Sequence, residues 1–221
     1  MTYKIISSNS KGNCIIINNC IALDMGVSWE RIQRFASQLK VVFISHEHQD
    51  HLRKSTVNRL AYQYPNIKFI VAPELVDNLL DLKVWKKNIC LLYPDRWYDM
   101  KMFKVKIQEL IHDVPNSCIH LDLDGEKIIY ATDTNEINHI EAKNYNYYFI
   151  ESNYDTDEEL EKVILEKEKR GEYCYEKRVL YSHLSQLKAL NWLDINNKNN
   201  GEVIFIHQSR RLNNIKNSNI T

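Results

Sequence analysis

Short apolar runs rich in β-branched residues recur along the chain, and several alternate apolar with polar positions. A period of two is typical of strands with one buried face, and β-branched residues favour strands in general. The pattern predicts ten strands, over residues 3–7, 14–18, 21–24, 41–45, 67–72, 103–110, 119–124, 127–133, 147–152 and 202–207.

Between these runs the apolar positions change to the spacing of amphipathic helices. We expect helices over residues 27–39, 55–64, 73–82, 155–171 and 185–195. Pro73 suits a first helical turn, and Thr156 with Glu159 forms a capping box. Strands cluster early and then alternate with helices, which indicates an α/β protein with two layers of sheet flanked by helices.

The bulk composition indicates one globular domain. The chain has 221 residues, of which 44% are hydrophobic and 26% charged, an ordinary balance for a folded domain. We find no repeat, linker or internal boundary, so a single domain over 1–221 is expected. The polar segment 211–221 is expected to be a flexible tail.

Charge and cysteine content narrow the function classes. Lys plus Arg equals Asp plus Glu at 29 each, so net charge gives no long-range steering towards nucleic acid or membrane, although a local basic groove stays possible. Five scattered cysteines without a CxxC pair indicate reduced thiols. No signal peptide or membrane-spanning stretch is recognisable. We therefore expect a cytoplasmic protein without a membrane partner.

The sequence HEHQDH at 46–51 directly follows the apolar run 41–45. Helical spacing would scatter its side chains, and a continuing strand would put Asp50 and His51 on opposite faces. A tight loop can turn several of them to one point. Imidazoles with carboxylates suit zinc or a similar divalent metal; a solvated polar loop is the alternative.

Three further residues resemble His46 in ending an apolar run, namely His112, Asp133 and His207. Ligands at the ends of several strands can converge on one edge of a layered sheet. Two dications about 3.5–4 Å apart also need an anionic bridge. Taken singly, a histidine after a strand is more often a loop or cap residue than a ligand.

HEHQDH matches the HxHxDH motif of the metallo-β-lactamase fold hydrolases. The resemblance covers nearly the whole chain: SSNSKGNC and ALDMG resemble the first strands of that family, with Asp24 at its usual strand-end aspartate. ESNYD (151–155) and SHLS (182–185) resemble the branch of ribonuclease Z and the WalJ-type nucleases. The resemblance implies a four-layer αββα sandwich with two mixed sheets.

The resemblance also implies a site for two divalent metal ions, Zn²⁺ first and Mn²⁺ or Mg²⁺ as alternatives. One ion would take His46, His48 and His112, the other Asp50, His51 and His207, and Asp133 would bridge them.

Asp50 would in addition orient the attacking water. His183 would support the leaving group, unless it is only a neighbour of a helix cap at Ser185. Substrate contacts are expected from Asn153, Ser185 and Arg210.

Only 21 positions separate His112 from Asp133, which leaves no room for the long arm with which ribonuclease Z grips tRNA. Without such an arm, this compact chain resembles the phage anti-Pycsar phosphodiesterases. The resemblance thus implies hydrolysis of cyclic nucleotides, including cyclic CMP and cyclic UMP, to nucleoside monophosphates. The protein would be a phage countermeasure in the host cytoplasm.

Several alternatives stay open. They are a nuclease acting on DNA or RNA, a thioester or lactam hydrolase, and a metal-stabilised binding module. Relatives often pair, so a homodimer is expected. Residues 83–103, with two tryptophans and two tyrosines, either contribute to such a contact or pack as core.

Overall fold

The computed structural model describes residues 1–209. The chain divides into two compact units, one of Met1–Glu109 with Val114–Glu126 and the other of Leu110–Asp113 with the chain from Lys127 onward. Arg210 and the predicted tail at 211–221 lie outside the described residues.

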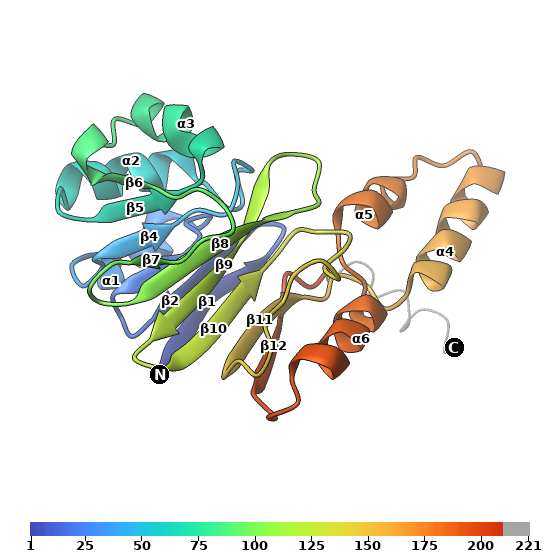
Figure 1. The fold of residues 1–221 in the computed structure, drawn as a ribbon. Coiled ribbons are helices and arrows are strands. Elements are labelled where there is room, and N and C mark those ends of the chain that lie inside the picture. Colours follow the sequence, from blue (N-terminus) through green and yellow to red (C-terminus); the bar gives the residue numbers. More distant parts are fainter. Residues whose placement is uncertain (210–221) are drawn as a thin grey trace. The chain divides into compact units, whose positions relative to one another are not determined.

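The first sheet lies within the first unit and has the order β1-β2-β3-β4-β5-β6 (Figure 1). Strands β1 to β3 pair antiparallel, whereas β3 to β6 pair parallel. The bounds are β1 Tyr3–Asn9, β2 Gly12–Ile17, β3 Ile21–Leu23, β4 Val41–Phe43, β5 Lys68–Val71 and β6 Ile89–Leu91.

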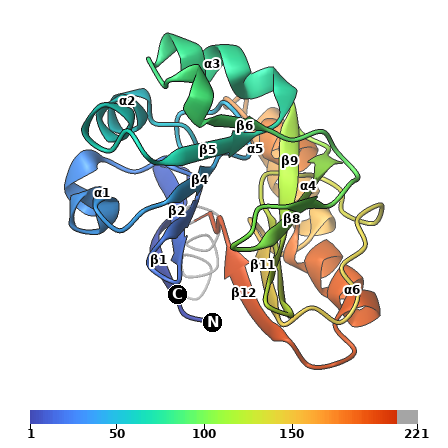
Figure 2. The same cartoon turned by 60° about the vertical axis from the view of Figure 1, so that its left-hand side comes forward.

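Parallel neighbours require crossover connections, and helices supply them here. Helices α1 (Trp29–Ala36), α2 (Lys54–Gln63) and α3 (Val76–Asp81) connect β3 to β4, β4 to β5 and β5 to β6. Pro73 opens the 3₁₀ turn η1 (Pro73–Leu75) ahead of α3, as predicted. Figure 2 shows the three helices along one side of this sheet.

The helices and the sheet enclose the core of the first unit. One buried cluster joins residues of all three helices to β2, β3, β4 and β5, among them Ile32, Val57, Leu79, Val42 and Phe69. Every residue of β2, β3 and β4 is buried. Strands β3 and β4, and β2 from Cys14 onward, are continuous apolar runs, which is typical of strands covered on both faces.

The second sheet has the order β12-β11-β10-β9-β8-β7. Strands β7 and β8 pair antiparallel, whereas β10, β11 and β12 pair parallel. The predicted class, α/β with two mixed sheets flanked by helices, is therefore confirmed. The bounds are β7 Tyr98–Asp99, β8 Lys104–Leu110, β9 Asn116–Leu123, β10 Glu126–Ala131, β11 Tyr147–Glu151 and β12 Glu202–Ile206.

The helices of the second unit are α4 (Asp157–Lys169), α5 (Glu176–Ser182) and α6 (Gln186–Asn196). Helix α6 packs on β11, where the rings of Trp192 and Tyr148 meet edge to face at 6.0 Å. Helices α4 and α5 pair around a small apolar cluster. Within residues 1–209, each helix is too short or too polar to cross a bilayer.

All predicted strands and helices are present, with ends shifted by a few residues. The prediction missed β6, β7 and α5. Strands β6 and β7 have three and two residues, too few to establish a period. Helix α5 (EKRVLYS) buries only Glu176 and Ser182, so it has no apolar stripe that a sequence pattern could reveal.

The predicted cap of α4 allows a stability test. The Thr156 side chain accepts a hydrogen bond from the Glu159 backbone N–H at 3.2 Å. We expect Thr156→Ala to lower the free energy of unfolding by about 1 kcal/mol, measured by urea titration. Ser28 begins α1 without a side-chain cap bond, so Ser28→Ala is the control; equal losses in both variants would contradict the cap.

Candidate metal centre

The HEHQDH segment forms a loop at the carboxyl end of β4, as predicted. His46 and His51 are buried, and their ring centroids lie 4.1 Å apart. Nε2 of His46 lies 3.2 Å from Nδ1 of His48. The loop thus gathers three imidazoles within the first unit, which argues against a merely solvated polar loop.

A buried carboxylate orients this loop. Asp24 accepts hydrogen bonds from the Ser45 backbone N–H at 2.8 Å and hydroxyl at 2.9 Å, and its Oδ2 lies 2.6 Å from Nδ1 of His51. Because Nδ1–H donates to Asp24, a neutral His51 presents the lone pair of Nε2, the nitrogen that a metal would take. Asp24 thus leaves Nε2 of His51 as the nitrogen available to a metal.

Replacing this carboxylate is expected to weaken metal binding. Asp24 has a φ of +59°, a conformation that asparagine also tolerates, so Asp24→Asn keeps the backbone and volume. Loss of the charge should lower zinc affinity about 10–100-fold, measured by competition with a chromogenic chelator. Asp99 of β7 is exposed, so Asp99→Asn is the control; wild-type affinity in Asp24→Asn would contradict this orienting function.

Asn13 contacts this loop, although the sequence motifs did not identify it. Its Nδ2 lies 2.9 Å from Nε2 of His51 and 3.4 Å from Oδ2 of Asp50, and its backbone N–H donates to the Asp50 carbonyl at 2.7 Å. Asn13 therefore fixes the last third of the HEHQDH loop. The only signal in the sequence was its place in the SSNSKGNC segment.

The second unit holds the other three predicted ligands. Asp133 follows β10 with a φ of +53° and is buried. Its Oδ1 lies 3.3 Å from Nδ1 of His207, and its Oδ2 lies 3.9 Å from Nε2 of His112. Each oxygen of one carboxylate thus faces a different histidine, which is the arrangement that a bridging ligand requires.

His112 is suited to be a neutral ligand. Its Nδ1 lies 2.9 Å from the Ser182 carbonyl, an acceptor that keeps the proton on Nδ1 and leaves the lone pair on Nε2. Burial lowers the pKa of His112, although Asp133 and Asp113 oppose that shift. A metal ligand must be unprotonated, so the lowered pKa favours coordination at neutral pH.

Glu151, at the end of β11, is the main residue that sequence analysis missed. It is fully buried, and its Oε1 lies 2.7 Å from Nδ1 of His183 and 3.1 Å from Nδ1 of His207. Its Oε2 accepts from the backbone N–H groups of Thr134 and Leu184. The signal available was an ionisable residue closing the apolar run YYFI.

Glu151 and His183 stabilise each other's charged forms. Burial disfavours both charged forms, but their mutual attraction is stronger: it lowers the pKa of Glu151 and raises the pKa of His183. The rings of His183 and His207 also stack at 5.1 Å. His183 therefore retains a proton more readily than a free histidine, as a proton donor should.

The ligand chemistry of the second unit fits a divalent metal. Asp133, Glu151, His183 and His207 each offer one ligand atom, and these atoms lie within 4.8 Å of one another. All are imidazole nitrogens or carboxylate oxygens, which suit zinc and similar ions. The seven predicted ligands divide into His46, His48, Asp50 and His51 in the first unit and His112, Asp133 and His207 in the second.

The predicted substrate contacts have structural partners. Asn153 is buried, and its Nδ2 donates to the His207 carbonyl at 3.0 Å. Ser185 is buried and caps α6 by accepting from the Lys188 N–H at 3.3 Å, which confirms the predicted helix start. Arg210 lies outside the described residues.

Comparison with known proteins identifies the fold. No protein-family model matches the sequence, and no curated protein sequence is significantly similar to it. Among solved structures, the metallo-β-lactamase fold protein YhfI from Bacillus subtilis has a TM-score of 0.68 at 14% identity, over 94% of this chain and 86% of that one.

Two further structures agree. The short form of human tRNase Z has a TM-score of 0.65 at 13% identity, over 96% of this chain and 94% of that one. Zn²⁺-bound PqqB from Methylobacterium extorquens has a TM-score of 0.63 at 9% identity, over 95% and 89%. At these identities the similarity establishes the metallo-β-lactamase fold.

Proposed function

We propose that this protein is a metal-dependent phosphodiester hydrolase. The observation that carries the proposal is the carboxylate of Asp133, whose two oxygens face His207 and His112. A carboxylate placed in this way can offset the repulsion between two dications. The metallo-β-lactamase fold of the chain supports the same conclusion.

The proposed ligands are those that the HxHxDH resemblance implies. His46, His48 and His112 would hold one ion, Asp50, His51 and His207 the other, and Asp133 would bridge. The set contains no thiolate, so Zn²⁺, Mn²⁺ and Mg²⁺ are all chemically compatible. Its five histidines favour Zn²⁺ among them.

When bound, such an ion acts as a Lewis acid and brings the pKa of a coordinated water to about 7. The protein's own residues would do the rest. The Asp50 carboxylate, 22% exposed, would accept a hydrogen bond from the attacking water and orient it. His183, held by Glu151, which raises its pKa, would give a proton to the leaving oxygen.

The first proposed substrate class is the cyclic nucleotides, including cyclic CMP and cyclic UMP, hydrolysed to nucleoside monophosphates. A cyclic nucleotide carries one phosphate, so it needs no long basic track, in keeping with a net charge of zero. In this form the protein would act as a phage countermeasure in the host cytoplasm and would work as a homodimer.

The second proposed substrate is a DNA or RNA strand. One observation favours it: the positive charge is not evenly spread, because residues 83–106 contain seven Lys or Arg and two Asp. A zero net charge therefore does not exclude a local track for phosphates.

One set of assays tests these proposals. The purified protein, loaded with Zn²⁺ or Mn²⁺, would be offered bis(p-nitrophenyl) phosphate, cyclic CMP, cyclic UMP, cyclic AMP and single-stranded DNA. Hydrolysis of bis(p-nitrophenyl) phosphate is expected whichever natural substrate class is correct. Its absence with both metals would overturn the proposed function. Turnover of DNA without any cyclic nucleotide would eliminate the first substrate class.

A variant of His183 tests whether this residue acts as a proton donor or as a metal ligand. We expect His183→Ala to lower the rate about 100-fold or more while the bound metal, measured by elemental analysis, stays at the wild-type level. The exposed His139 provides the control variant His139→Ala. Loss of metal from His183→Ala would instead make this histidine a ligand.

A further inference from the structure

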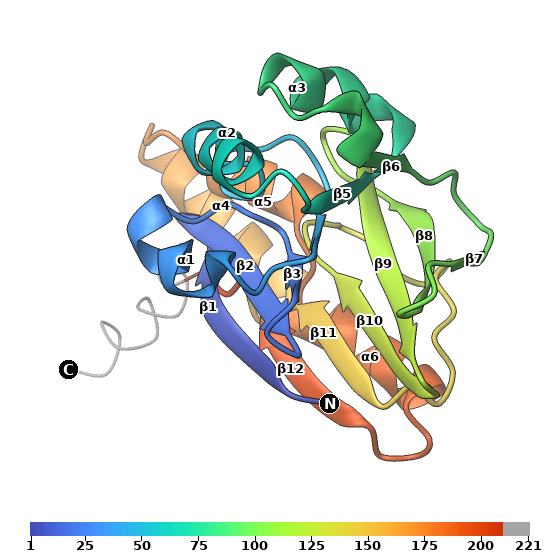
Figure 3. The same cartoon turned by 90° about the vertical axis from the view of Figure 1, so that its left-hand side faces the viewer.

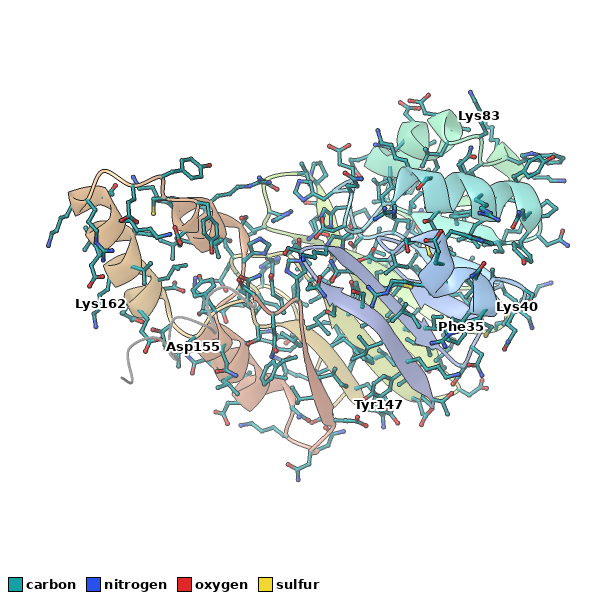
Figure 4. The ribbon with its side chains drawn as sticks, turned by 180° about the vertical axis from the view of Figure 1, so that it is seen from behind. Phe35, Lys40, Lys83, Tyr147, Asp155 and Lys162 are labelled. Atoms are coloured by element: carbon teal, nitrogen blue, oxygen red, sulfur yellow. The ribbon has the colours of Figure 1, made fainter. Side chains whose placement is uncertain are left out.

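Residues 83–106 form a basic and aromatic segment of the first unit, lying between α3 and the middle of β8. Trp85, Tyr93 and Trp97 are 57%, 51% and 45% exposed, so these rings do not belong to the core. Lys83, at the start of the segment, also projects from the unit (Figure 4). A stretch that exposes aromatic rings among cations needs a functional explanation.

Five residues make up what we call the aromatic–cation surface: Tyr93, Arg96, Trp97, Tyr98 and Lys106. The Arg96 guanidinium lies 5.4 Å from the ring centroid of Tyr93 and 4.8 Å from that of Tyr98. The Lys106 ammonium lies 5.9 Å from the ring of Trp97. Each of the three rings thus has a positive charge beside it.

The surface is held in place before any ligand binds. The Tyr98 hydroxyl accepts a hydrogen bond from the Tyr93 backbone N–H at 2.9 Å and another from Arg96. The turn is fastened to β8, because the Asp95 N–H donates to the Ile107 carbonyl at 2.9 Å. Rings that are already ordered lose little conformational freedom on binding.

The surface starts at the sheet edge that carries the HEHQDH loop. The Ile44 N–H donates to Ile70 and the Leu92 N–H donates to Val71, so the segments leaving β4 and β6 continue on opposite sides of β5. Neighbouring strands are about 4.8 Å apart, which separates the two segments by roughly 10 Å. Figure 3 shows the chain passing from β6 through β7 into β8.

We propose that the aromatic–cation surface binds a single strand of nucleic acid. Bases would stack on Trp97 and the two tyrosines, and phosphates would contact Arg96 and Lys106; single-strand binding combines such stacking with a positively charged track. A duplex hides its base faces and would leave the rings without partners. The inference rests on the polynucleotide form of the proposed function.

A second copy of the chain is a poorer occupant. In a two-fold dimer each surface meets its own equivalent, so the excess of positive charge in residues 83–106 would face itself. Like charges brought together at an interface repel each other and disfavour association. A polyanion would neutralise this positive charge, whereas a second copy of the chain would add to it.

Fluorescence anisotropy with the full chain and labelled, hydrolysis-resistant phosphorothioate 12-mers tests the proposal, with DNA and RNA arms. We expect Trp97→Ala to weaken binding about 10-fold, Trp97→Phe to retain most of the affinity, and Lys106→Gln to lower the salt slope by about one. Tyr62 on α2 is 86% exposed, and the control Tyr62→Ala should bind as the wild type does.

Hydrolysis of bis(p-nitrophenyl) phosphate separates this inference from the proposed function. The small diester needs no strand-binding surface, so its turnover should be equal in all four variants. Wild-type strand affinity in Trp97→Ala, preference for duplex over single strands, or a dimer that Trp97→Ala dissociates would each overturn the inference. Absence of diester turnover alongside intact strand binding would overturn the proposed function alone.

Discussion

Replacement of Asp133 by asparagine is expected to abolish hydrolysis of phosphodiesters. Asparagine has nearly the size of aspartate and also tolerates the φ of +53° at this position, but it carries no negative charge. One carboxylate oxygen faces His207 and the other His112, so an amide would leave one ion facing an NH₂ group. Removal of residues that merely support ligands costs 10–100-fold, so we expect a loss of at least about 100-fold here.

Two measurements are required for this prediction, namely the rate with bis(p-nitrophenyl) phosphate and the metal content of the purified variant. Both should fall together, because the proposed bridge would serve metal binding and charge balance at once. Asp194 on α6 has an 85% exposed side chain, so Asp194→Asn is the matched control. Full activity with two bound ions in Asp133→Asn would show that the bridging assignment is wrong.

Local sequence pattern was sufficient for most strands and helices and for the placement of the HEHQDH loop. The strand run 41–45 and the crowding of imidazoles after it are both properties of a few consecutive residues. Asn13 and Glu151 are different, since each is a single polar residue at or beside an apolar run. Their importance comes from His51 and His183, which are 38 and 32 positions away, so only the fold reveals it.

Prediction from sequence has the same limit for binding surfaces, as the net charge shows. A total of zero is compatible with an even mixture of charges or with segregated ones, and these have different consequences for binding. The excess of cations in residues 83–106 is visible in the sequence, but the exposure of Trp85 and Trp97 is not. Exposure argues against core packing for both rings, and it makes Trp97 available for the proposed binding of a single strand.

The largest effect on folding is expected at Gly26. A Cβ built on this residue would lie 1.6 Å from the carbonyl oxygen of Asp50 and 2.8 Å from the backbone nitrogen of His51. Both atoms belong to the backbone, so no side-chain rotation relieves the overlap. The Gly26 N–H also donates to the Asn13 carbonyl at 2.9 Å, while the Asn13 N–H donates to Asp50 at 2.7 Å.

Gly26→Ala must therefore either break this set of backbone contacts or move the HEHQDH loop. We expect the free energy of unfolding to fall by about 3 kcal/mol or more, together with loss of metal, since Asp50 and His51 are displaced. Gly125 is the control: its φ of +91° strains alanine, but nothing lies within 4 Å, so Gly125→Ala should cost only about 1–2 kcal/mol. Equal stability by urea titration and equal metal content by elemental analysis in the two variants would contradict this prediction. The close approach at Gly26 would then not be needed to position the HEHQDH loop.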